Sequence, residues 1–467
     1  MPAKPSRSHS DGGSNAVSPA RREAFAILLA LESAKGHADD LLRGQRVSAL
    51  SPQDRNLCTT LVMGTLRWQI RLDALIRPLL AKPNARLDAE IRIALRLGAL
   101  QLLFLDRIPA HAAIGESVAL AKSAGHKFAS GLVNAVLRKL AAIPKPAQLP
   151  PSDARAEQLA EVTAHPAWMV QRWVANYGFE AARAICQHGQ NQPELTLRFE
   201  DPEAEAMLAE EGIRVAPGAI LTAARRVLSG DVTSLAVMQS GRVRIQEEGS
   251  QLIAELAGHG RTILDCCAAP GGKTLILAER NPLAQVTALE VSPERCRALQ
   301  ARMATSPFST QIEARIGDAT QLPADPAYDL ILADVPCSGT GTMGRNPEIR
   351  HRLQPEDLSR HHQRQCAILR AALGAGTRRV VYSTCSLEPE ENGAVVAEVL
   401  AQSHEWHQIS ISRVLHELRE EGRLTAESVG TLQKTIAPDG SMTILPGSLG
   451  PDIQTDGFFI AILEKQG

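Results

Sequence analysis

The sequence contains no Cys-x-x-Cys pair and no long run of apolar residues, and only 3% of its residues are aromatic. Without paired cysteines a zinc finger or ribbon is not expected, so we predict no metal site. No stretch approaches the roughly 18 apolar residues that a membrane-spanning helix needs, and the polar N-terminus has no apolar core of a secretory signal. The scarcity of aromatic side chains leaves little material for extended base-stacking surfaces.

Eight cysteines are nevertheless scattered along the chain. They are Cys58, Cys186, Cys266, Cys267, Cys296, Cys337, Cys366 and Cys385. With no secretory signal we expect a cytoplasmic protein, in which thiols stay reduced. A reduced thiol can act as a nucleophile, although a buried cysteine is more often inert.

The net charge of −1 conceals an uneven distribution along the 467 residues. Residues 1–145 hold 21 Lys and Arg against 11 Asp and Glu, whereas the remaining residues hold 29 against 40. A basic N-terminal part on an acidic remainder indicates that the N-terminal part meets a polyanion such as RNA.

The patterning predicts a multidomain chain. Residues 1–18 are predicted as a disordered tail, and 19–143 have apolar residues at helical spacing throughout, which predicts an all-α domain of five to seven helices. The proline-rich stretch 144–158 is predicted as a linker. Residues 159–242 mix helix and strand and indicate a small α+β module. From 243 to 467 strands and helices alternate, which predicts an α/β, Rossmann-like domain with a mostly parallel, doubly wound sheet.

The elements of this last domain can be placed individually. Strands are predicted at 262–265, 285–290, 312–316, 328–333 and 379–383, with helices at 273–280, 293–305, 355–375 and 390–401. Two further segments, 442–445 and 457–463, are predicted as antiparallel edge strands. Open parallel sheets bind ligands outside the carboxyl ends of their strands, and the unusual residues of this chain collect there.

The first predicted strand ends in the small-residue run Asp265-Cys-Cys-Ala-Ala-Pro-Gly-Gly-Lys-Thr274. Cys267 stands where a phosphate-binding loop requires glycine, and this run contains no Gly-x-Gly-x-x-Gly, so a P-loop and a dinucleotide loop are both excluded here. A tight turn of small residues before a helix suits S-adenosylmethionine, which carries no phosphate. We therefore predict this cofactor.

Acids end three successive strands at the same edge. Glu290 is placed to accept hydrogen bonds from ribose hydroxyls. Asp318 is placed to accept from an adenine amine, and Asp334 follows the next strand. Three carboxylates in these positions favour a ligand site over a solvated surface.

Two cysteines follow neighbouring strands, Cys337 in Asp334-Val-Pro-Cys and Cys385 in Ser-Thr-Cys. C5 of cytosine is a poor nucleophile, but a thiolate that adds to C6 makes C5 enamine-like, and a base must later remove the C5 proton. Cys385, Asp334 and Cys337 offer a thiolate, a hydrogen-bonding group for the activated ring and a release base. The alternative is that both cysteines are packing residues.

The run from Cys267 to Lys273, Pro336-Cys337 and Thr384-Cys385 resembles the motifs of RNA cytosine-C5 methyltransferases. Further matches are Gln246-Glu-Glu-Gly-Ser250, Glu388-Pro-Glu-Glu-Asn392 and Asp456-Gly-Phe-Phe459. The resemblance implies that Cys385 is the nucleophile and that Cys337 assists release. The cofactor contacts that it implies are Cys267, Ala268, Ala269, Pro270, Gly271, Gly272, Lys273, Glu290, Asp318 and Asp334.

The N-terminal helical domain resembles NusB, an RNA-binding fold, in its helical layout and in the segment from Gly131 to Arg138. Both parts together look like the bacterial Sun/RsmB group (NOL/NOP/Sun), which implies small-subunit ribosomal RNA as substrate. We expect a monomer that needs neither metal nor membrane. Glu290 departs from the commoner Asp of the family, and Asn346 stands where His is frequent.

Three alternatives remain at this point. The chain could methylate transfer RNA, it could be a non-catalytic RNA-binding factor in ribosome assembly, or it could methylate DNA with the Pro-Cys thiol attacking. The Thr-Cys pair and the basic helical domain argue against DNA. The cations predicted to contact RNA are Arg67, Arg71, Arg92, Arg96, Arg138, Arg345, Arg350 and Arg352.

Overall fold

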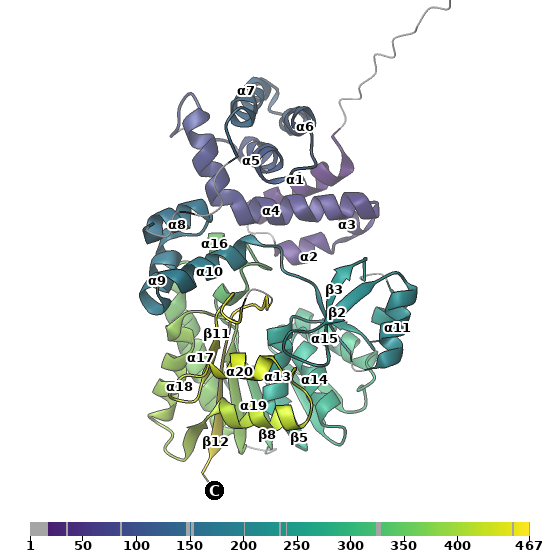
Figure 1. Cartoon of the computed structure of the whole chain (residues 1–467), viewed down its shortest axis with the longest axis vertical. Helices are drawn as coiled ribbons and strands as arrows, with labels where there is room; N and C mark the ends of the chain where they lie inside the picture. Colours follow the sequence, from purple (N-terminus) through teal and green to yellow (C-terminus); the bar gives the residue numbers. More distant parts are fainter. Residues whose placement is uncertain are drawn as a thin grey trace, which may run out of the picture. The chain divides into compact units, whose positions relative to one another are not determined.

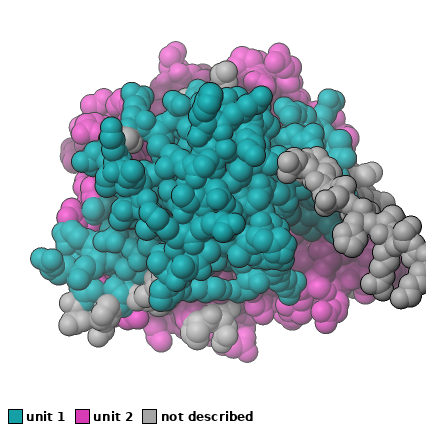
Figure 2. Space-filling model, turned by 90° about the horizontal axis from the view of Figure 1, so that it is seen from above, with its two compact units in different colours: residues 1–167 teal, residues 168–467 magenta. Residues whose placement is uncertain are grey.

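The computed structural model of the chain, drawn as a cartoon in Figure 1, divides into two compact units, residues 1–167 and 168–467 (Figure 2). It describes residues 17–33, 36–84, 86–145, 150, 154–199, 201–232, 235–239, 241–323, 328–450 and 453–466. Most of the tail predicted over 1–18, and part of the linker predicted over 144–158, lie outside these residues. No helix within the described ranges is long and apolar enough to cross a membrane.

The first unit is entirely helical. Its elements are α1 (Pro19–Glu32), α2 (Ala38–Leu42), α3 (Gln45–Ser48), α4 (Pro52–Ile76), η1 (Arg77–Leu79), α5 (Ala89–Phe104), α6 (Ala110–Ser123), η2 (Lys127–Ala129), α7 (Ser130–Ala141) and α8 (Ala156–Val162). The α4 helix begins where Ser51 accepts a hydrogen bond from the backbone of Asp54 and Pro52 occupies the first turn. Leu97 and Leu100 of α5 are buried in the core, and the all-α domain is confirmed.

The second unit opens with a small α+β module, as predicted. It contains α9 (Ala167–Tyr177), α10 (Phe179–Gln190), β1 (Thr196–Arg198), α11 (Pro202–Glu210), β2 (Arg214–Pro217), β3 (Ala224–Ser229), α12 (Ala236–Gln239) and β4 (Arg244–Ile245). The four strands form an antiparallel sheet in the order β2-β3-β1-β4. Leu197, Phe199, Leu208 and Val243 are buried in its own core.

The large sheet has eight strands and follows in sequence after this module (Figure 1). Its strands are β5 (Thr262–Asp265), β6 (Gln285–Glu290), β7 (Ile312–Ile316), β8 (Leu330–Asp334), β9 (Arg379–Thr384), β10 (Trp406–Ile409), β11 (Met442–Ile444) and β12 (Phe458–Lys465). Its helical elements are α13 (Glu248–Ala257), α14 (Gly272–Arg280), α15 (Pro293–Ala304), η3 (Thr340–Thr342), α16 (Ile349–Arg352), α17 (Asp357–Gly374), η4 (Pro389–Glu391), α18 (Gly393–Leu400), α19 (Ile411–Glu420) and α20 (Ser428–Gln433).

The spatial order is β7-β6-β5-β8-β9-β12-β10, with β11 paired to β12. The strands β5 to β9 are parallel, so the doubly wound prediction is confirmed. The prediction of an edge strand at 457–463 is wrong, because β12 lies between β9 and β10 and pairs antiparallel with both. Residues 458 to 463 are all buried, and such a continuous apolar run is typical of a strand covered on both faces.

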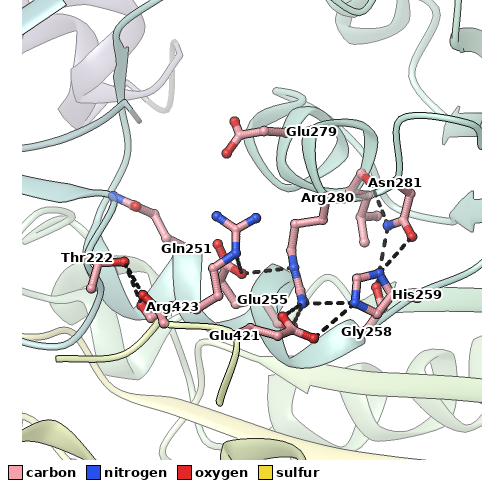
Figure 3. Close-up of polar contacts among 12 residues, drawn as sticks. Thr222, Gln251, Glu255, Gly258, His259, Glu279, Arg280, Asn281, Glu421 and Arg423 are labelled. Atoms are coloured by element: carbon pink, nitrogen blue, oxygen red, sulfur yellow. Dashed lines mark hydrogen bonds and ion pairs between the residues drawn. The ribbon is translucent and has the colours of Figure 1, made fainter. Parts of the chain in front are cut away.

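A buried ion network joins the small module to the large domain. Arg198 of β1 is fully buried and contacts Glu255 of α13 and Glu279 of α14, each at 2.6 Å. Arg280 lies between Glu255 and Glu421, at 3.1 and 2.6 Å (Figure 3). Removing one partner would leave a buried charge uncompensated, at a cost of about 3–5 kcal/mol. The network therefore links the module to α13 and α14, and loss of a single charge is expected to destabilise this contact.

Candidate active site

The carboxyl ends of β5, β6, β7, β8 and β9 meet at one edge of the sheet and line a cavity of about 320 Å³. The predicted site residues that line it are Cys267, Ala269, Glu290, Asp318, Asp334, Cys337 and Cys385. A second cavity of about 120 Å³ shares Cys267, Ala269 and Asp334 with the first. It adds the predicted residues Ala268, Pro270, Gly272 and Lys273.

The turn between β5 and α14 is built on a glycine and a buried acid. Gly271 has φ of 97°, and a Cβ on it would lie 2.7 Å from Leu299 and 2.7 Å from Met303. It lines neither cavity, so the structure gives it the role of allowing the turn. The carboxylate of Asp265 accepts from Thr274 at 2.7 Å, and burial raises the pKa of Asp265 to about 6.

The acids after β6 and β7 differ in environment. Glu290 is buried and accepts a hydrogen bond from the backbone of Ser292 at 2.9 Å. Arg295, which the sequence did not suggest, lines the same cavity and approaches Glu290 at 3.4 Å. Asp318 is exposed and accepts from the backbone and hydroxyl of Thr320, which lowers the pKa of Asp318.

Asp334 at the end of β8 has both oxygens engaged. Lys273 donates to one at 2.7 Å, and the hydroxyl of Ser383 donates to the other at 2.8 Å. Burial lowers the pKa of Lys273, but its contact with Asp334 outweighs this effect, so the pKa stands above its usual value. Lys273 lines the second cavity and Cys385 the first, and Asp334 lines both.

The two predicted cysteines form a close pair. Sγ of Cys337 and Sγ of Cys385 are 3.4 Å apart, and both side chains are half-buried in the cavity wall. The contact with Cys385, together with burial, raises the pKa of Cys337 well above its usual value. Cys337 is therefore a neutral thiol near pH 7.

A buried carboxylate, Glu391, holds the residues that follow both cysteines. It accepts hydrogen bonds from the backbone and hydroxyl of Ser338, which follows Cys337. It also accepts from the hydroxyl of Ser386, which follows Cys385, and from Gln365 at 3.0 Å. Glu391 is fully buried, so one side chain fixes the spacing of the two cysteine loops. The sequence signals this residue only through the run from Glu388 to Asn392.

Backbone hydrogen bonds of two glycines also connect the two cysteine loops. The backbone of Gly341 donates to the carbonyl of Cys385, and the backbone of Gly457 donates to the carbonyl of Gly341, each at 2.9 Å. A Cβ on Gly341 would lie 2.3 Å from the carbonyl oxygen of Gly457, so only glycine fits there.

Asp456 precedes Gly457 and is itself anchored. It contacts Arg345 at 2.7 Å and His188 at 3.1 Å, and its backbone donates to Glu247 at 3.3 Å. Burial and the nearby charge of Asp456 raise the pKa of Glu247 from 4.5 to about 7.

Several arginines predicted to contact RNA have structural roles instead. Arg67, Arg96 and Arg350 are buried. Arg96 is held by Glu32 and Asp73, and Arg350 donates to the carbonyl of Gly189. The charge pattern could not separate these positions from exposed ones, because helical spacing does not reveal which face is covered.

Comparison with known proteins matches most of the chain. Residues 255–464 match the family model described as 16S rRNA methyltransferase RsmB/F, residues 18–142 match the NusB family, and residues 165–229 match the RsmF/B-like ferredoxin-like domain. A probable ribosomal RNA small subunit methyltransferase B from Bacillus subtilis is 34% identical over 95% of this chain and 98% of its own length.

Other relatives agree with this result. A ribosomal RNA small subunit methyltransferase B from Pseudomonas putida is 34% identical over 82% of this chain and 89% of its own length. The crystal structure of PH0851 superposes over 96% of this chain and 99% of its own, with a TM-score of 0.75 and 21% identity, which shows a shared fold.

Proposed function

Because the chain belongs to the RsmB/F family of 16S rRNA methyltransferases, we propose that it methylates C5 of a cytidine in small-subunit ribosomal RNA. The observation that carries the C5 position is the pair of sulfurs, Cys337 and Cys385, 3.4 Å apart in the cavity that Glu290, Asp318 and Asp334 also line. One cavity thus offers acids for a nucleoside cofactor and two thiols for one pyrimidine ring.

The residues of the two cavities fit S-adenosylmethionine. Ala268, Ala269 and Gly272 leave room for a ligand against the backbone, and the carboxylates of Glu290 and Asp318 can accept from ribose hydroxyls and an adenine amine. When bound, this cofactor supplies an electrophilic methyl group. The chain's own residues must supply every other part of the reaction.

Cys385 is assigned as the nucleophile. Its side chain lines the same cavity as Glu290, Asp318 and Asp334, where the cofactor and the cytosine ring would meet. The thiolate forms a bond to C6 of cytosine, and the electron pair of the C5–C6 double bond shifts onto the ring. C5 then takes the methyl group. Asp334 lies where it can hold the activated ring, because Lys273 and Ser383 fix its carboxylate at the cavity wall.

Cys337 is assigned to release. After losing its own proton to solvent, its thiolate accepts the proton from C5, the electron pair restores the C5–C6 double bond, and the bond between C6 and Cys385 breaks. C5 and C6 are neighbouring ring atoms, and the close spacing of the two sulfurs suits one group for each. Neither thiol is consumed.

We favour small-subunit ribosomal RNA over transfer RNA, because the relatives from Bacillus subtilis and Pseudomonas putida are named as methyltransferases of that RNA. The helical domain supports an RNA substrate, since it matches NusB and carries the excess of basic residues. We also propose that the protein acts in the cytoplasm, as a monomer.

The proposal is tested by methyl transfer. Purified protein, radiolabelled S-adenosylmethionine and small-subunit ribosomal RNA lacking cytosine methylation are incubated together, and the RNA is digested to nucleosides. Label in 5-methylcytidine supports the proposal. Label in another nucleoside would refute the C5 assignment, and label only in a parallel transfer RNA reaction would refute the substrate.

A further inference from the structure

A histidine, a cysteine and a glutamate meet where α17 packs against α18. Within the residues that the structure describes, His362, Cys366 and Glu398 form a group whose possible ligand atoms all lie within 4.8 Å of one another. His362 and Cys366 are four residues apart and share one face of α17, while Glu398 comes from α18. Nε2 of His362 is 2.8 Å from Oε2 of Glu398 and 3.5 Å from Sγ of Cys366.

Two of the three side chains are held by groups outside the cluster. Nδ1 of His362 lies 2.6 Å from the backbone carbonyl of Glu390, to which it must donate, so Nε2 is the nitrogen that faces Cys366 and Glu398. Arg370 donates to Oε1 of Glu398 at 2.7 Å, which leaves Oε2 toward His362. Histidine ligands of metals almost always donate their other ring N–H to a carbonyl or carboxylate in this way.

We propose that Nε2 of His362, Sγ of Cys366 and a carboxylate oxygen of Glu398 bind a divalent cation of the zinc class. The nitrogen, sulfur and oxygen donor set suits Zn²⁺, which takes four ligands and would complete its shell with water. Bonds of about 2.0–2.3 Å to a tetrahedral ion place ligand atoms roughly 3–4 Å apart, close to the spacing already present. Only small side-chain adjustments would admit the ion.

Binding displaces protons, because the ligands must be a thiolate and a neutral imidazole. When Cys366 binds the cation, a metal–sulfur bond replaces the S–H bond of its thiol, and that proton passes to solvent.

The cation would stabilise the segment that contains Glu390 and Glu391, which supports the two cysteine loops. The carbonyl that orients His362 belongs to Glu390, and the next residue, Glu391, holds Ser338 and Ser386. The sequence did not predict this site, because it contains no Cys-x-x-Cys motif. Glu398 is also 32 residues from Cys366, and the two approach each other only because α17 packs against α18. The inference does not depend on which RNA is methylated.

Cobalt titration of the whole protein tests the site. Metal-stripped protein is titrated with Co²⁺, whose bond to a thiolate gives a near-ultraviolet charge-transfer band, and Zn²⁺ is then added to displace it. We expect one Co²⁺ per chain and loss of the band in Cys366→Ser. Cys186→Ser, which removes a buried thiol of α10, is the matched control and should keep the band.

His362 and Glu398 are more exposed than Cys366, so their variants test the site even if the Cys366 variant fails to fold. His362→Gln and Glu398→Gln should each weaken Co²⁺ binding at least tenfold, with circular dichroism unchanged. A band that survives all three ligand variants and disappears in Cys337→Ser or Cys385→Ser would place the metal at the cysteine pair and overturn the proposal. The absence of any stoichiometric binding would overturn it as well.

Discussion

Sγ of Cys337 lies 3.4 Å from Sγ of Cys385, although 48 residues separate them in the chain. The reason is topological, since β8 and β9 are parallel neighbours and their following loops leave the same edge of the sheet. Glu391 then fixes the distance between the two loops. Two sulfurs held this closely can reach adjacent atoms of one ring, which is the basis of the first predictions.

Replacing each cysteine by alanine should separate attack from release. Cys385→Ala should abolish both turnover and any covalent complex with RNA. Cys337→Ala should permit attack and methyl transfer but lower turnover by about 10²–10⁴-fold, because the C5 proton is no longer removed efficiently. Denaturing gels with labelled RNA would show an accumulated adduct in the second variant alone. The reverse pattern would exchange the roles, and full activity in both variants would leave them as packing residues.

Release should accelerate with pH. In the adduct Cys385 is a neutral thioether and its contact no longer raises the pKa of Cys337, but burial and the charge of Glu391 still raise this pKa, so near pH 7 only a small fraction of Cys337 is thiolate. That fraction, and with it the decay of the adduct, should rise about tenfold per pH unit below the pKa. Quenched single-turnover reactions from pH 6.5 to 9 would measure the decay. Cys337→Ala is the control and should show little pH dependence, and a flat profile in the native protein would contradict the assignment.

Glu391 should act as a positioning residue. Glu391→Gln keeps the shape but loses acceptor capacity toward Ser338, Ser386 and Gln365, and displacement of a reacting group by about 1 Å can cost 10²-fold in rate. We expect kcat to fall by that order while cofactor affinity, measured by calorimetry, stays within a few fold. Glu420→Gln, on the exposed end of α19, is the control. Unchanged kcat in Glu391→Gln would remove the carboxylate from the mechanism.

The stability of the domain should depend on pH through Glu247. The pKa of Glu247 is raised from 4.5 in the unfolded chain to about 7 in the folded protein. The contribution of its protonated form to the free energy of unfolding is therefore fully present below pH 4.5 and is lost as pH rises through 7. Glu247→Gln, which cannot ionise, should therefore gain stability relative to the native protein between pH 5 and 8. The melting temperature should differ by about 2–4 °C per kcal/mol gained. A melting-temperature difference that is constant with pH would contradict the effect, and Glu211→Gln serves as the exposed control.

RNA binding by the helical domain should weaken when exposed cations are removed. Lys127 and Arg138 are exposed, so their glutamine variants should bind RNA less tightly at low salt. The slope of log K against log salt should become shallower by about 0.7–0.9 for each phosphate that the variant no longer neutralises. Fluorescence anisotropy over a salt series would measure this. Arg419→Gln, exposed on α19, is the comparison, and equal effects from all three would mean that the domain has no special share in binding.

The sequence predicted the parallel strands well and the end of the domain poorly. The residue ranges of β5, β6 and β7 were anticipated without error. Apolar residues alternate along β6 and β7, and each strand either ends at an acid or is followed by glycine. The strand β10 (Trp406–Ile409) was not predicted, because two of its four residues are polar. Its extended conformation depends on its pairing with β12, which lies far along the chain. The interior place of β12 depends on which strand it pairs with, and no local pattern encodes that choice.

The same distinction applies to the active site. Residues at strand ends were found because a parallel sheet brings all such ends to one edge, so chain position predicts spatial position. Glu391 was missed because its partners Ser338 and Gln365 lie 53 and 26 residues away. Gly271 was predicted as a cofactor contact together with Pro270 and Gly272, but it lines neither cavity, and its positive φ is what the turn requires.

The position of β12 also bears on how the domain is made. β12 pairs with β9 along six residues, and Gly457 just before it donates to Gly341 beside the Cys385 carbonyl. Of the strands in the sheet it is the last to leave the ribosome, so during translation the β9 edge stays open and the two cysteine loops lack one of their supports. We therefore expect a nascent chain to complete the site only after synthesis has passed this strand.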